Sequence, residues 1–72
     1  MSVVKVIELI AESSESWEAA AQVAVTHASK TVRNIKSVYM KDFQAKVDSN
    51  KITQYRVTVK ITFVVDDTKG KG

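Results

Sequence analysis

The residues best suited to chemistry lie in the stretch QYRVTVKITF, residues 54–63, where polar side chains alternate with apolar ones. The polar positions are Arg56, Thr58, Lys60 and Thr62. An alternation of period two is typical of a β-strand with one buried face and one face open to water. The function of the chain therefore depends on what this polar face contacts.

Arg56 has two interpretations. A guanidinium can clamp a phosphate or a carboxylate through two parallel hydrogen bonds, so arginines from several copies of the chain can hold a nucleotide or coenzyme A. Alternatively, Arg56 pairs with an acid such as Glu8 or Asp42, of the same or another subunit. Both interpretations stay open at the level of the sequence.

Aromatic residues and the single histidine are the other candidates. Tyr39 follows Ser37 by two residues, so both point to the same side of a strand, where Tyr39 offers either a flat ligand surface or an interface contact. Trp17 is interpreted as a packing anchor, and His27 as an exposed or interface residue. No glycine-rich phosphate loop, zincin pair or distinctive carboxylate pair occurs, so we expect no enzyme activity.

Length and composition favour self-association. A chain of 72 residues forms one domain, and a domain of this size buries only about 60% of the surface of its unfolded chain. It contains no cysteine and one histidine, so disulfides and thiolate metal sites cannot supplement the core. The net charge of +3 comes from basic residues interspersed with acids, which makes nucleic acid an unlikely partner.

The first residues, MSVVKVIELIAESS, carry acids where a secretory signal needs an unbroken apolar run. No apolar run is long enough to cross a bilayer. We therefore expect a cytoplasmic protein with no membrane partner.

Four elements are predicted along the chain. Residues 3–10 form a strand covered on both faces, and residues 17–33 form a helix capped by Ser13, Ser14 or Ser16. Residues 35–47 form a long strand that can bend, and 51–65 form a strand joined to it by a turn at Asp48, Ser49 and Asn50. Residues 67–72 are predicted to be a flexible tail.

The predicted fold class is α+β, with the order β-α-β-β. The crossover helix makes the first two strands parallel, and the hairpin makes the third antiparallel to both, so the third strand can lie in the middle of an antiparallel sheet. One face of this sheet takes the helix, and the opposite face stays uncovered. The candidates for the helix-covered face are Tyr55, Val57, Val59, Ile61 and Phe63.

The segments KVIEL, SSESWEAAAQVAV, KTVRNI and QYRVTVKITF together resemble the dodecins, small β-α-β-β proteins. The resemblance covers residues 4–65 and implies a single dodecin-like domain over residues 1–66. It further implies a hollow homododecamer, with helices outside and sheets lining the interior, that binds and stores flavins without catalysis. Such a shell would supply through subunit contacts the core that one chain lacks.

The resemblance also implies where a flavin, riboflavin or FMN, would bind. Ser37 stands where flavin-binding dodecins place a ring-stacking tryptophan, and Arg56 stands where they place a ring-binding glutamine. Tyr39 and Thr58 complete the candidate cofactor-binding set. We therefore expect weak flavin binding, with coenzyme A, a divalent cation such as Ca²⁺ at an unlocated metal site, or a purely structural shell as alternatives.

Overall fold

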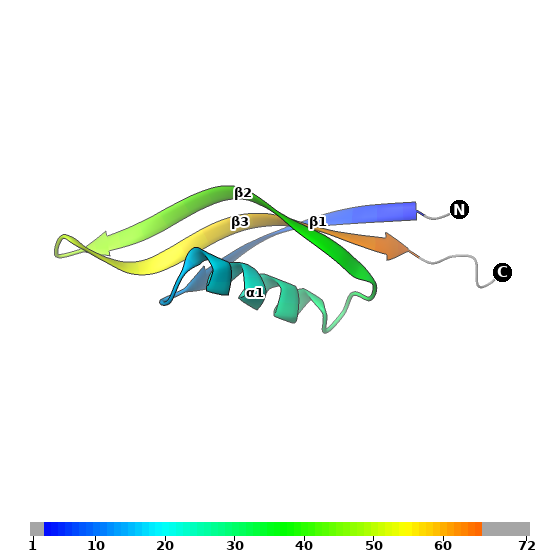
Figure 1. The fold of residues 1–72 in the computed structure, drawn as a ribbon, viewed down its shortest axis with the longest axis horizontal. Helices are drawn as coiled ribbons and strands as arrows, with labels where there is room; N and C mark the ends of the chain where they lie inside the picture. The colour runs from blue at the N-terminus through cyan, green and yellow to red at the C-terminus, as the bar shows by residue number, and fades with distance from the viewer. Residues whose placement is uncertain (1–2, 66–72) are drawn as a thin grey trace.

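A computed structural model describes residues 3–65, which form one helix and a three-stranded sheet. The elements follow in the order β1 (Val3–Ser13), α1 (Trp17–Ala28), β2 (Ile35–Asp48) and β3 (Lys51–Val65), as Figure 1 shows. The predicted β-α-β-β order is confirmed. Residues 1–2 and 66–72, which include the predicted tail, lie outside the described residues.

The strands lie in the order β1-β3-β2, with β3 antiparallel to both neighbours. This confirms the predicted central position of β3. β1 is longer than predicted, because Ala11, Glu12 and Ser13 continue its pairing with β3. The sheet therefore extends past the point where the sequence pattern alone ends the first strand.

Helix α1 begins after Ser16, whose extended backbone and side chain cap it. The Ser16 hydroxyl oxygen accepts a hydrogen bond from the Ala19 amide at 2.9 Å, satisfying a donor that the first helical turn leaves free. The predicted end at residue 33 is wrong, because α1 ends at Ala28. The amide of Lys30 donates to the carbonyl of His27 at 3.2 Å, and this bond between residues three apart closes a tighter turn at the end of the helix.

The hairpin between β2 and β3 turns at Ser49 and Asn50, as predicted. Their φ angles are 52° and 65°, and two consecutive positive φ values are what a tight type I′ hairpin turn requires. The sequence allowed for a bend in β2, and the register of β2 against β3 shifts between Met40 and Asp42. This bulge explains why apolar residues change from even to odd positions along β2.

The core between α1 and the sheet is thin. Val57, Val59 and Ile61 of β3 are 0% exposed, and they face a helix stripe made of alanine. Alanine allows the helix to lie close to the sheet but buries little apolar area per residue. The buried alanines of this core are Ala11, Ala20, Ala21, Ala24 and Ala28.

Trp17 fixes the start of α1 to the sheet. Its indole Nε1 donates a hydrogen bond to the carbonyl of Gln44 at 2.8 Å. Its ring meets those of Phe43 and Tyr55 edge-on, with centroids 5.9 and 4.9 Å apart. The structure thus shows the packing contact expected for Trp17.

Much apolar surface stays outside this core. The prediction that the first strand is covered on both faces is wrong for one subunit, because Val4, Val6 and Ile10 are 53%, 55% and 66% exposed. Within residues 3–65, the outer edges of β1 and β2 have no neighbouring strand. None of the described helical structure is long and apolar enough to span a membrane.

Candidate ligand-binding face

The sheet surface opposite α1, which we call the open face, is built from rows of directly paired side chains. Paired residues on adjacent strands point to the same side of a sheet, so the register identifies each row. In order along β3 toward its N-terminal end, the four rows with partners on both sides are Val6–Thr62–Ser37, Glu8–Lys60–Tyr39, Ile10–Thr58–Asp42 and Glu12–Arg56–Gln44. No element within residues 3–65 covers these rows.

The open face contains all four candidate cofactor-binding residues, but they do not converge within one subunit. Ser37 lies in the first row with Thr62, and Arg56 lies in the last, six residues away along β3. At 3.2–3.4 Å per residue, this is a separation of about 20 Å. Tyr39 and Thr58 occupy the two rows between. A small ligand that contacts both Ser37 and Arg56 therefore needs more than one copy of the chain.

Arg56 is engaged in an ion pair. Its Nη2 lies 2.5 Å from Oε2 of Glu12, and its Nε donates to the same oxygen at 2.7 Å. The expectation of an acidic partner is confirmed, but the suggested partners Glu8 and Asp42 are wrong within one subunit. Glu12 is the direct partner of Arg56 on β1 and was missed because the sequence does not show that β1 reaches this far.

A second ion pair crosses the open face. Nζ of Lys41, at the bulge of β2, lies 3.5 Å from Oε2 of Glu8 on β1. The two side chains remain 44% and 48% exposed. Lys60, in the same row as Glu8, makes no ion pair within residues 3–65. The ammonium group of Lys41 and that of Lys60 therefore have one carboxylate, that of Glu8, as a neighbour in this row.

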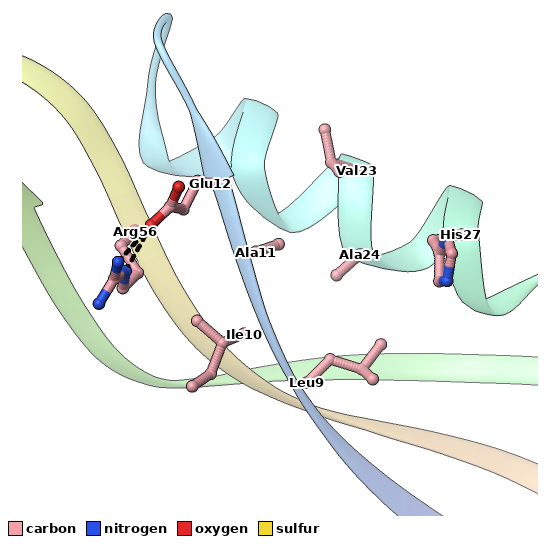
Figure 2. Close-up of a pocket in the computed structure, with 8 residues that line it drawn as sticks. All are labelled: Leu9, Ile10, Ala11, Glu12, Val23, Ala24, His27 and Arg56. Carbon is pink, nitrogen blue, oxygen red and sulfur yellow. Dashed lines mark hydrogen bonds and ion pairs between the residues drawn. The ribbon is translucent and has the colours of Figure 1, made fainter.

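A groove of about 700 Å³ runs between β1 and α1 (Figure 2). Its walls are mainly apolar, from Leu9, Ile10 and Ala11 on the strand and Val23 and Ala24 on the helix. Glu12 and Arg56 also line this groove, from the side of β1 away from the helix in Figure 2, and His27 lines it farther along the helix. His27 is exposed, which is one of the two positions expected for it.

A smaller polar cavity of about 280 Å³ also borders Arg56. It combines two cations, one carboxylate and two side-chain amides, which can both donate and accept hydrogen bonds. These are Arg56, Lys46, Glu12, Gln44 and Gln54. Glu12 already pairs with the Arg56 guanidinium. A phosphate that enters this cavity therefore meets less positive charge than it would beside an unpaired arginine.

One chain does not form a complete metal site. Among residues 3–65, no three His, Cys, Asp or Glu side chains converge to hold a metal ion. Ca²⁺ requires six to eight oxygen ligands, and two of the three carboxylates of the open face are engaged by Lys41 and Arg56. The residues of a single subunit therefore do not fit this ion.

The comparisons with known proteins agree on one family. The Dodecin family model matches residues 3–66. The dodecin of Thermus thermophilus is 30% identical over 66 residues, which cover 92% of this chain and 96% of the relative. A crystal structure of a single-substitution variant of that dodecin superposes with a TM-score of 0.87 at 28% identity, covering 93% of this chain and all of the other.

A second relative is the calcium dodecin of Mycobacterium tuberculosis, 38% identical over 63 residues, which cover 88% of this chain and 89% of the relative. Its crystal structure superposes with a TM-score of 0.77 at 37% identity, covering 93% of this chain and 96% of the other. That protein is described as a calcium-chelating antigen with a novel calcium-binding site.

Proposed function

Because the chain belongs to the dodecin family, we propose that it assembles into a hollow homododecamer and binds a small molecule on the open faces of its sheets. In this shell the helices lie outside and the open faces line the interior. The role is storage or shielding of the bound molecule in the cytoplasm, without catalysis.

The observation that carries the proposal is the contrast between a thin core and a large uncovered surface. The core of one chain consists of alanines and three β3 residues, while apolar side chains on β1 stay more than half exposed. Apolar patches of this kind mark contacts with other molecules. The groove beside β1 and the open face are the surfaces through which we propose that subunits and ligand make contact.

Among the ligands considered, a flavin fits the open face in part. A flat ring needs a flat apolar surface. Ser37 provides none, but Tyr39 in the next row is 63% exposed and can replace it. Clamping of coenzyme A by Arg56 is less favoured, because Glu12 already accepts two contacts from the guanidinium. We therefore propose weak binding of riboflavin or FMN, with Tyr39 as the aromatic contact.

Native mass spectrometry tests the assembly and the ligand together. Twelve copies of the 8.0 kDa chain give a mass of about 96 kDa, plus the mass of any retained molecule. We expect this species to dominate at micromolar concentration. A folded monomer that persists at that concentration would contradict the proposal, since the open face would then serve no assembly.

Calcium binding is a second candidate, favoured by the likeness to the calcium dodecin. Since one chain lacks a complete set of ligands, the ion would be bound by carboxylates of several copies. Asp42 is the carboxylate of the open face that forms no ion pair within residues 3–65 and is therefore available.

Calorimetric titration of the assembled protein with CaCl₂ tests this candidate. We expect Asp42→Asn to abolish heat of binding, while Glu15→Gln, in the exposed loop before α1, leaves it intact. No binding by the unmodified assembly, or equal binding by both variants, removes Ca²⁺ at this position from consideration.

A further inference from the structure

The end of the β2–β3 hairpin extends past the start of α1 and the end of β1 (Figure 1). β1 ends at Ser13, the partner of Tyr55, so residues 46–54, which we call the arm, have no third strand beside them. We propose that the arm of one copy docks in the groove between β1 and α1 of a second copy, with Val47 and Ile52 against its apolar walls. This inference rests on the proposed function, because it names surfaces through which subunits of the shell meet.

One side of the arm is apolar and uncovered. Val47 and Ile52 are direct partners, and Val47 follows Phe43 by four residues on β2, so all three lie on one side of the sheet. That side is the one that α1 covers, because Phe43 pairs with the buried Val57. Val47 and Ile52 are nevertheless more than half exposed, since α1 begins at Trp17, which packs on Phe43. A two-stranded ribbon with an exposed apolar side is marginal in water and needs a partner.

The groove offers apolar walls and a free strand edge. Leu9 and Ile10 both line it, and consecutive side chains of a strand point to opposite faces, so the groove reaches the outer edge of β1. Within residues 3–65 no strand pairs with this edge. An arm that lies along it can hydrogen-bond to the free backbone groups of β1 and thereby extend the sheet. Val23 of α1, 48% exposed, forms the wall on the helix side.

The arm cannot fill the groove of its own chain. Ala11, which lines the groove, is the partner of Val57, and β3 runs from there toward the arm. Ile52 lies five residues beyond Val57, which is about 16 Å along the strand. Each copy therefore carries one arm and one groove, and only another copy can join them. A contact between two different surfaces of one chain is heterologous, and within a closed shell such contacts form rings.

The charges of the two surfaces do not oppose this contact. Lys46 and Asp48 flank Val47 on β2 and therefore point to the other side of the arm. In the groove, the carboxylate of Glu12 and the guanidinium of Arg56 neutralise each other. Docking thus brings apolar side chains together without placing an unpaired carboxylate or ammonium group between them, which would be costly.

Introduced cysteines test the contact directly, because the chain contains none. Cysteine is itself a small apolar residue, so it preserves the character of both surfaces. In protein that carries both Val23→Cys and Ile52→Cys, a short bismaleimide should join the groove of each copy to the arm of the next. We expect a ladder of covalent multimers on a denaturing gel. Ile52→Cys alone should stay monomeric on the gel, and a covalent dimer would show that arms meet each other around a two-fold axis, which overturns the inference.

The matched control combines Val23→Cys with Lys36→Cys, an exposed residue at the opposite end of β2 from the arm. We expect the control to give no ladder. A ladder of equal yield would show that the reagent joins the subunits without regard to the arm, and would remove the support for this contact.

A charge placed on the apolar side of the arm should weaken the assembly. Ile52→Asp should raise the protein concentration of half-dissociation at least about tenfold, because a carboxylate would enter an apolar groove. Thr53→Asp adds the same charge at the next exposed residue and should change this concentration less than about twofold. Native mass spectra over a dilution series measure both, and equal effects contradict the inference. An assembled protein without the ladder rejects only the arm contact, whereas an unmodified protein that stays monomeric rejects the proposed function.

Discussion

The two faces of β3 share one backbone but have different surroundings. On the side of α1, Val57, Val59 and Ile61 are completely buried. On the other side, Arg56 is exposed and Thr58, Lys60 and Thr62 are only partly covered. Successive side chains of a strand point to opposite faces, so one segment can serve both surfaces. The difference indicates that the face covered by α1 supplies the contacts that fold the chain. The open face remains available for contacts with other molecules.

The largest difference between the faces should appear in stability. Ile61→Ala removes buried atoms from a core that has few large side chains, and such changes typically cost about 2–5 kcal/mol. Thr62→Ala, the next residue but on the open face, should change the free energy of unfolding by about 0.5 kcal/mol or less. Urea unfolding followed by Trp17 fluorescence, at one fixed protein concentration, measures both.

Comparable losses for these two variants would mean that the open face is packed as tightly in the assembly as the helix-covered face. The position of the chain's stabilising contacts would then have to be assigned to subunit interfaces rather than to α1.

The next effect concerns ligand affinity. Ser37→Trp adds a flat apolar surface to the uncharged row beside Tyr39, and we expect riboflavin affinity to rise about tenfold, which corresponds to about 1.4 kcal/mol. Quenching of riboflavin fluorescence measures the change. Lys30→Trp, an exposed residue just beyond α1, is the control and should leave the affinity unaltered. An intact oligomer with Ser37→Trp and no gain would show that this row is closed by a neighbouring subunit.

A smaller effect is expected at the Glu12–Arg56 pair. The side chains are 36% and 48% exposed, and partly exposed pairs typically contribute about 0.2–1 kcal/mol. Arg56→Gln and Glu12→Gln should each destabilise the protein within this range, and the double variant should lose less than the sum. A double-mutant cycle measures the coupling. A vanishing coupling energy would show that the pair is incidental, leaving Arg56 free for a ligand.

The smallest effect should come from Lys41. Its ammonium lies 3.5 Å from Glu8, and both side chains are close to half exposed. Lys41→Gln should therefore change the free energy of unfolding by less than about 0.5 kcal/mol. A loss above 1 kcal/mol, measured by the same urea titration, would indicate that this pair is buried by another subunit.

Local patterns account for much of the fold. The alternation at residues 55–63 predicted β3 and assigned its residues to the correct faces, and the serines before Trp17 located the start of the helix. The ends of two elements were predicted less accurately. β1 extends to Ser13 through pairing with β3, and α1 stops at Ala28. The end of β1 depends on pairing with β3, which is distant in the sequence and which a local pattern does not contain.

The sequence proposed the members of the candidate site but not their arrangement. The sequence by itself determined that Ser37 and Tyr39 share one side of β2 and that Thr58 and Arg56 share one side of β3, because side-chain direction follows from position along a strand. Only the tertiary structure decided which of them are neighbours. The register of β1 against β3 joins Glu12 to Arg56, and the bulge near Met40 sets which β2 side chains meet β3, leaving Lys60 beside Tyr39. Register depends on pairing between segments far apart in the chain, so alternation of period two groups the residues of an uninterrupted strand segment by side but does not give their partners.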